Sequence, residues 1–144
     1  MRILAVDPGE KRLGIAISDP TGTIANPLTV IKHTSRLLDA AEIASLAAQQ
    51  GVGKIIVGQV LDSDNQPTPQ SRSAARLAEA IRTQSNLPVE LWDESGSTQA
   101  ALQAHIAMGG SRRSRQQRGH GHLDDLAATY ILQTYLDAQA GFRE

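Results

Sequence analysis

The chain has 144 residues, of which 40% are hydrophobic, a formal net charge of -1 and no cysteine. This length suits one domain, residues 1–144, and the composition excludes a disordered, collagen-like or membrane-embedded protein. The lack of cysteine excludes disulfides, thiolate metal sites and a cysteine nucleophile. Asp7 stands where a signal peptide would need an apolar stretch, so we expect a cytoplasmic protein with no membrane partner.

The first part of the chain predicts a hairpin, a third strand and a helix. Residues 2–6 and 13–18 are apolar runs, and the Pro8-Gly9-Glu10 turn between them predicts an antiparallel pair. A third strand is expected near residues 27–31. Thr34 or Ser35 can then cap a helix that ends at Gly51.

In the second part, predicted strands and helices alternate. Residues 54–58 form a compact apolar strand, Thr68-Pro69 can begin a helix that runs to about Ser85, and residues 88–94 form a strand that ends in two acids. A helix is expected from Ser97 or Thr98 to Gly109-Gly110. Residues 111–122 contain no apolar side chain and predict a loop, and residues 122–140 form an amphipathic helix.

This order of elements predicts an α/β fold. Strand–helix–strand connections within one sheet are right-handed parallel crossovers, whereas the opening hairpin is antiparallel. We therefore expect a mixed five-stranded sheet, with a three-strand antiparallel start followed by the crossovers, and helices on its faces.

Acids stand at the ends of two predicted strands and at the start of the last helix. Asp7 follows the first strand, Asp93 and Glu94 end a later one, and Asp124 and Asp125 open the helix. Ligands of open α/β sheets collect beyond the carboxyl ends of the strands, so these acids can converge. Converging carboxylates need a cation, and hard oxygen ligands favour Mg²⁺ or Mn²⁺. Two such ions about 4 Å apart can promote hydrolysis of a phosphodiester.

Each acid alone also has an ordinary structural explanation. Aspartate after a strand is a common turn former, and acids in the first turn of a helix are stabilised by the helix dipole. Successive strand residues point to opposite faces, so at most one of Asp93 and Glu94 can face the site. The hypothesis of a metal-dependent nuclease therefore depends on the joint arrangement.

Four segments resemble one known family. AVDPGEKRLGIAISD resembles the D-x-G-x-K-R-x-G-x-A-x-S-D motif of the YqgF/RuvX proteins, and IIVGQ, LWDESGST and LDDLAATYILQTYL resemble later blocks of the same family. These proteins are resolvase-like members of the ribonuclease H superfamily, assigned as nucleases of the small-subunit ribosomal RNA precursor. The resemblance implies a ribonuclease H-like fold and metal-dependent hydrolysis of nucleic acid, and it alone favours structured RNA over branched DNA.

By position, the resemblance implies that Asp7, Glu94 and Asp124 are the catalytic, metal-binding acids. Asp124 is preferred over its neighbour because it stands three residues before the first alanine of the LAAT segment, as the family's aspartate does. Lys11 and Arg12 match a basic pair that the resemblance places beside the nucleic acid.

The chain departs from the family pattern directly after Glu94. Ser95-Gly96 stands where the family has arginine and leucine, so a cation expected beside the site is missing while the three acids are kept. This departure leaves a non-catalytic nucleic-acid or ribosome-associated factor as an alternative function. A Holliday-junction-type DNA resolvase is the other.

The segment GGSRRSRQQRGHGH precedes the third acid and carries Arg112, Arg113, Arg115 and Arg118. Arginine contacts with phosphates contribute affinity without reading sequence, so this loop predicts non-specific binding of the nucleic-acid backbone. The alternative is a solvated loop whose charges only keep the protein soluble. Its position beside Asp124 favours nucleic acid.

The histidines and the single tryptophan are less informative. His120 and His122 are a weak zinc signal without a third ligand, and they could instead add charge near phosphate or move a proton at the site. Trp92 lies inside a predicted strand and is expected in the core. His33 and His105 suggest no function.

Other enzyme classes fit less well. Actin-like ATPases and sugar kinases also begin with a strand, an aspartate and a glycine-rich turn, but they need two such domains, and neither a phosphate loop nor a nucleophile elbow is present. The sequence therefore predicts a nuclease that uses in-line attack by an activated water. On the resemblance, it processes the 5′ end of the small-subunit ribosomal RNA precursor in ribosome biogenesis.

Overall fold

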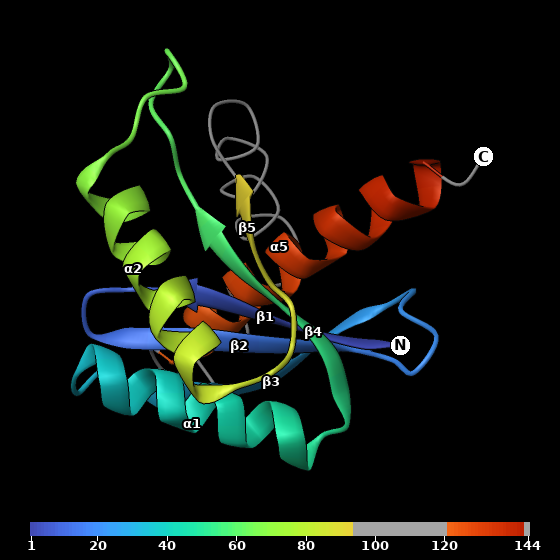
Figure 1. Cartoon of the computed structure of the whole chain (residues 1–144). Helices are drawn as coiled ribbons and strands as arrows, with labels where there is room; N and C mark the ends of the chain where they lie inside the picture. Colours follow the sequence, from blue (N-terminus) through green and yellow to red (C-terminus); the bar gives the residue numbers. More distant parts are fainter. Residues whose placement is uncertain (94–120, 143–144) are drawn as a thin grey trace.

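The computed structural model describes residues 1–93 and 121–142, and within the last helix the side chains of residues 126–140. A mixed sheet lies between two helical layers (Figure 1). In chain order the elements are β1 (Arg2–Pro8), β2 (Arg12–Ser18), β3 (Ala25–Lys32), α1 (Arg36–Gln49), β4 (Val52–Gln59), α2 (Pro69–Gln84), β5 (Val89–Asp93) and α5 (Gly121–Phe142).

The sheet has the expected topology. Its five strands lie in the order β3-β2-β1-β4-β5. The β1–β2 and β2–β3 pairs are antiparallel, and the β1–β4 and β4–β5 pairs are parallel. The predicted α/β class and the mixed five-stranded sheet are confirmed. Central β1 thus ends at the edge where β4 and β5 also end, which is where a ligand site was expected.

Alternation along the strands divides the core into two layers. In β1, Leu4 and Val6 pack in the layer beneath α1 and α2, whereas Ile3 and Ala5 pack beneath α5 (Figure 1). Side chains two residues apart share a face of a strand. Asp7, two residues after Ala5, therefore belongs to the face that α5 covers.

Two helices begin at the caps that the sequence predicts. The Ser35 side chain accepts a hydrogen bond from the backbone N–H of Leu38 at 3.2 Å. Thr68 and Ser71 form a reciprocal capping box, with Pro69 at the first helical position. These caps place the starts of α1 and α2 near the carboxyl ends of β3 and β4.

The last helix begins earlier than predicted. The predicted end of the loop over residues 111–122 is wrong, because Gly121 and His122 already belong to α5. Assigned helix ends commonly differ by a residue or two. The predicted helix from residue 97 to 109 lies outside the described residues. No helix in the part that the structure describes is long and apolar enough to cross a membrane.

Side chains remote in sequence hold α5 against the sheet. The Lys54 Nζ donates to the Tyr135 hydroxyl at 2.6 Å and pairs with Glu90 Oε2 at 2.7 Å, and the Tyr135 hydroxyl donates to Glu90 Oε2 at 3.1 Å. Trp92 packs edge-on against Tyr135, with ring centroids 5.1 Å apart, and its Nε1 donates to Thr134 Oγ1 at 3.0 Å. Trp92, which was expected in the core, is partly buried and packs against the core at the interface with α5.

Candidate active site

Asp7 lies in a row of residues that crosses the sheet on the α5 face. It is paired with Gly14 of β2, which is paired in turn with Val30 of β3. On the other side, the Val6–Val57 pair makes Gly58 the next β4 residue beside Asp7, and Gly58 is paired with Trp92. Asp7 is thus flanked on both strands by glycine.

Gly58 lets α5 approach the sheet closely beside Asp7. A Cβ on Gly58 would lie 2.9 Å from Ile131 Cδ1 of α5, closer than side-chain atoms normally come. Glycine at a strand interior commonly marks such a close approach. The Asp7 carboxylate therefore stands at the end of β1, on the face of the sheet that α5 crosses, between Gly14 and Gly58.

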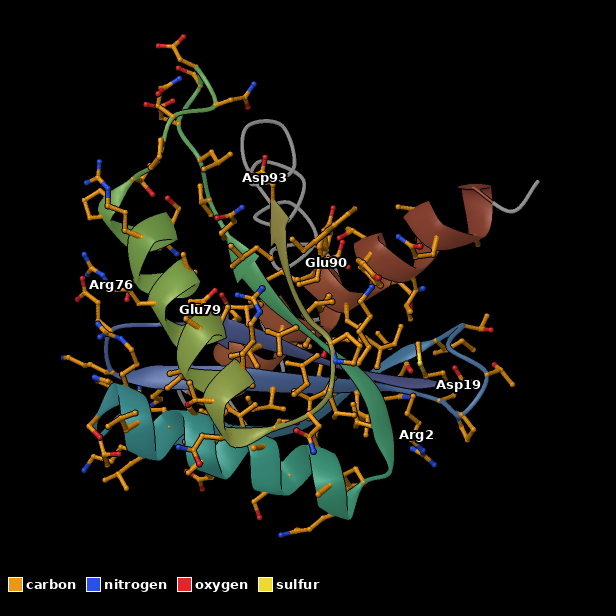
Figure 2. All side chains as sticks on the ribbon, in the orientation of Figure 1. Arg2, Asp19, Arg76, Glu79, Glu90 and Asp93 are labelled. Atoms are coloured by element: carbon orange, nitrogen blue, oxygen red, sulfur yellow. The ribbon has the colours of Figure 1, made fainter. Side chains whose placement is uncertain are left out.

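The alternation of β5 distinguishes the two acids at its end. Glu90 bonds Tyr135 of α5 and Trp92 packs on the same helix, whereas Leu91 packs in the opposite layer. Asp93 stands two residues after Leu91 and therefore belongs to the same face of β5, away from α5. Figure 2 shows Asp93 at the tip of the strand, beyond Glu90.

The other two expected acids are described only in part or not at all. Glu94 lies outside the described residues. The backbone of Asp124 lies in the first turn of α5, as expected, but its side chain is outside the described set. Among the side chains that the structure describes, no group of three histidines or acids could hold a metal. The fit of a metal therefore rests on Asp7, a hard oxygen donor at the end of the central strand, and on Asp124 in the first turn of α5.

The basic pair lies next to Asp7 in the chain and is exposed. Lys11 and Arg12 follow the turn after β1, and both side chains are exposed. Arg12 is directly opposite Lys32 of β3, and the Lys11 carbonyl accepts a hydrogen bond from the backbone N–H of His33 at 2.9 Å. The structure therefore brings together the predicted basic pair and two residues that the sequence analysis did not select.

The predicted loop residues cannot be placed in the same way. Arg112, Arg113, Arg115, Arg118 and His120 lie outside the described residues, and of His122 only the backbone position in α5 is described.

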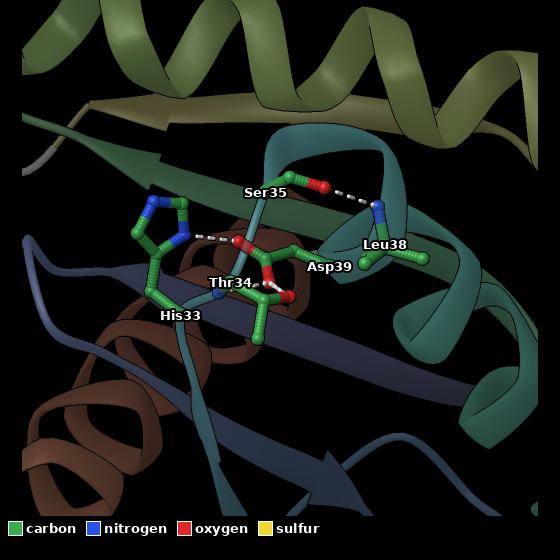
Figure 3. Close-up of polar contacts among 5 residues, drawn as sticks. All are labelled: His33, Thr34, Ser35, Leu38 and Asp39. Carbon is green, nitrogen blue, oxygen red and sulfur yellow. Dashed lines mark hydrogen bonds and ion pairs between the residues drawn. The ribbon is translucent and has the colours of Figure 1, made fainter.

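His33 and Asp39 form a polar cluster that sequence analysis missed (Figure 3). The Asp39 carboxylate is 2% exposed and contacts His33 Nδ1. It also accepts from the backbone N–H of Thr34 at 3.1 Å and from its Oγ1 at 3.3 Å. The signal in the sequence was weak, because it consists of one histidine and one aspartate across a helix start.

Asp19 of the first motif has a structural role at the other end of the sheet (Figure 2). Its carboxylate accepts backbone N–H bonds from Ile24 at 2.9 Å and Thr23 at 2.8 Å, and it contacts the Thr21 hydroxyl. The Ile24 N–H bond, followed by the Thr21 and Thr23 contacts, holds the pKa of Asp19 well below its usual range. Asp19 therefore orders the β2–β3 connection, away from Asp7.

A family model described as "RuvX: Holliday junction resolvase" matches residues 1–138. A protein of Thermoanaerobacter pseudethanolicus is 37% identical over 139 residues, which covers 96% of this chain and 98% of the relative. One of Moorella thermoacetica is 36% identical over 137 residues, or 95% of each chain. Both relatives carry the name "Putative pre-16S rRNA nuclease".

Two solved resolvases share the fold. Thermus thermophilus RuvC in complex with a Holliday junction substrate matches with a TM-score of 0.56 and 15% identity, over 98% of this chain and 96% of that one. The fowlpox virus Holliday junction resolvase matches with a TM-score of 0.57 and 20% identity, over 96% and 99% of the two chains. At these identities the likeness concerns the fold, and it confirms the expected ribonuclease H-like architecture.

Proposed function

Because this chain belongs to the RuvX family, we propose that it is a metal-dependent nuclease that hydrolyses phosphodiester bonds in nucleic acid. The observation that carries the proposal is the position of Asp7. This acid ends the central strand, belongs to the face that α5 crosses, and stands between Gly14 and Gly58 in the row that crosses the sheet. The resemblance and the relatives' names favour the small-subunit ribosomal RNA precursor as the substrate. We further propose that the protein acts in the cytoplasm and that residues 1–144 form one domain.

We assign Asp7, Glu94 and Asp124 as the residues that would hold Mg²⁺ or Mn²⁺. Glu94 is chosen over Asp93 because the resemblance assigns it and because Asp93 belongs to the face of β5 away from α5. Asp124 is chosen because it belongs to the first turn of that helix. Bound divalent ions supply a nucleophilic water and neutralise charge at the leaving oxygen. The protein's own part is to hold the three carboxylates together and to exclude other orientations.

Basic residues would orient the substrate for in-line attack. Lys11 and Arg12 follow directly on the turn after Asp7 and are exposed, so they can bind the phosphates next to the scissile bond. Arg112, Arg113, Arg115 and Arg118 would add affinity for the backbone without reading sequence. No residue is assigned as a covalent nucleophile, and the chain has no cysteine that could serve as one.

A cleavage assay with matched acid variants tests this proposal. The substrates are an RNA carrying the 5′ leader of the small-subunit precursor and a four-way DNA junction, each with Mg²⁺, Mn²⁺ or EDTA. We expect Asp7→Asn and Asp124→Asn to slow cleavage by more than the roughly 10–100-fold that follows loss of an outer-shell partner of a metal. Asp93→Asn and Asp125→Asn are the controls and should cleave at nearly the parent rate. Equal losses in all four variants would refute the assignment.

The departure at Ser95-Gly96 supports a second candidate, a nucleic-acid or ribosome-associated factor without catalysis. The same assay separates the two. Binding that survives in Asp7→Asn, with no cleavage by the parent under any metal condition, would favour the factor. Cleavage of the junction but not of the RNA would favour a DNA resolvase.

A further inference from the structure

Lys32, the last residue of β3, and His33 lie beside Lys11 and Arg12, and these four residues form a basic cluster. Arg12 and Lys32 are directly opposite each other in the antiparallel β2–β3 pair, so their side chains share one face of the sheet. His33 follows Lys32, and its backbone N–H bonds to the Lys11 carbonyl at 2.9 Å. Four residues that can carry positive charge thus meet where two strands end.

The pairing of Arg12 with Lys32 is unfavourable for the sheet itself. Like charges directly opposite in an antiparallel pair destabilise it, and an acid at either position would relieve the repulsion. Within the described part of the chain, neither side chain forms an ion pair with a carboxylate. This arrangement makes sense if an anion from outside the protein lies between the two cations.

The cluster lines a groove that can accept such an anion. The groove has a volume of about 660 Å³ and is lined by Glu10, Lys11, Arg12, Val30, Lys32 and His33. Glu10 is the one acid among these lining residues. The positive side chains outnumber it, so the groove favours a polyanion over a neutral or cationic ligand.

His33 is held in place from the helical layer (Figure 3). Its Nδ1 contacts the carboxylate of Asp39, whose side chain is 3% exposed, while the His33 side chain is 42% exposed. Because the carboxylate occupies Nδ1, the other ring nitrogen is left for a ligand. A phosphate oxygen only accepts hydrogen bonds, so His33 would bind it by donating a ring N–H.

The groove opens on the same face as the catalytic acid. Arg12 is two residues from Gly14, which is paired with Asp7, so Arg12, Lys32 and Asp7 share the α5 face. Two strand spacings and two residues of rise place the Lys32 Cα roughly 12 Å from the Asp7 Cα. A nucleic-acid backbone cleaved at Asp7 can therefore continue into the groove.

We propose that Lys32 and His33 bind the phosphodiester backbone of the substrate next to the cleaved bond, extending the surface that begins at Lys11 and Arg12. The proposal deepens the proposed function and rests on it for the identity of the polyanion. It predicts a track toward the β3 edge of the sheet, separate from the arginine-rich loop.

The test measures binding without cleavage. Fluorescence anisotropy of labelled RNA and DNA, single-stranded and duplex, is recorded in EDTA across a range of KCl concentrations, with the full chain. We expect Lys32→Gln to weaken binding about threefold to tenfold at low salt and to reduce the slope of log affinity against log salt by about 1. Arg2→Gln is the matched control, because Arg2 lies at the opposite end of the sheet (Figure 2), and it should leave both quantities unchanged.

His33 has its own readout. The parent should bind the labelled RNA and DNA more tightly than His33→Gln does, in the same EDTA and KCl conditions. Equal affinities of the two proteins would remove His33 from the track.

Lys32→Glu tests whether a loss of affinity comes from a loss of folding. It replaces a repulsive cross-strand pair by an attractive one, so the variant should melt no lower than the parent while its affinity falls further than that of Lys32→Gln. Binding by both Lys32 variants equal to that of Arg2→Gln would overturn the proposal. If the Lys32 variants bind as the parent does and the parent shows metal-dependent cleavage, only the proposed role of the groove is refuted. If the Lys32 variants bind more weakly but the parent does not cleave, the nuclease activity is refuted and the role of the groove stands.

Discussion

Asp7 depends on neighbours that have no side chains. Gly14 and Gly58 stand on either side of it in the row that crosses the sheet, so the carboxylate is not covered by the strands that position it. A side chain in place of Gly58 would meet Ile131 of α5, so this neighbour of Asp7 has to be glycine for the helix to pack as it does. The sequence shows both glycines, but only strand register shows that they flank the acid.

Tyr135 places a hydroxyl in a buried position between two charges. The residue is 2% exposed, and its hydroxyl accepts from Lys54 and donates to Glu90. The residues concerned come from β4, β5 and α5, so this one group links three elements.

We expect Tyr135→Phe to lower the free energy of unfolding by about 1–2 kcal/mol, because two hydrogen bonds to charged groups are lost while the ring stays packed. The loss is limited because Lys54 and Glu90 still pair with each other at 2.7 Å. Urea denaturation measures it. A variant as stable as the parent would show that the hydroxyl contributes nothing net.

At the scale of elements, the position of α5 over the sheet is set by close packing at Gly58. The helix packs its buried face, which includes Ile131 and Leu132, on the side of the sheet that carries Ala5 and Ile56. The approach is close because Gly58 has no Cβ to oppose Ile131.

Gly58→Ala is expected to cost about 1–3 kcal/mol, since the new methyl group would lie 2.9 Å from Ile131 Cδ1 in a filled core. Because relief of this clash moves α5, cleavage should fall along with the melting temperature.

Gly51→Ala is the matched control for that variant. Gly51 has a positive φ of 66° but nothing within 4 Å of its would-be Cβ. It should therefore lose stability through backbone strain, while the cleavage rate measured well below its melting temperature stays at the parent level. Equal losses of activity in the two variants would show that α5 placement is not what Gly58 protects.

At the scale of the whole molecule, an ion pair between β4 and β5 binds the Tyr135 hydroxyl of α5 and so links the sheet to that helix. Lys54 lowers the pKa of Glu90, and this effect, helped by the Tyr135 hydroxyl, outweighs burial. For Lys54, burial alone would lower the pKa, but the bonds to Glu90 and Tyr135 outweigh it and raise the value. Both shifts stabilise the charged pair in the folded state.

The pH dependence of stability follows from these directions. The contribution of Glu90 is complete above its ordinary pKa of 4.5 and is lost as the pH falls through the lower pKa of the folded state. That of Lys54 is complete below 10.5 and is lost as the pH rises through the raised value. Both contributions are therefore present at neutral pH.

We expect Glu90→Gln to melt below the parent near neutral pH and the difference to shrink as the medium is acidified below about pH 4. Thermal melts across this range measure the difference, and comparison with the parent cancels the separate acid sensitivity that Asp19 contributes. A difference that grows on acidification would contradict the direction assigned to Glu90.

The sequence by itself determined the order and type of the elements, the caps of α1 and α2 and the place of Asp7 at the end of a strand. These features follow from turn residues, hydrophobic periodicity and capping side chains, all of which act between near neighbours in the chain. The motif with Asp7, Lys11 and Arg12 is likewise contiguous, so its family resemblance could be read directly.

Only the tertiary structure decided which residues share a face and a row. The opposition of Arg12 to Lys32, the contact of Gly58 with Ile131 and the link of Lys54 to Tyr135 join positions far apart in the chain. Such contacts depend on strand register and on how a helix packs across a sheet. Periodicity shows which residues of one element face the same way, but it does not show which residue of another element they meet.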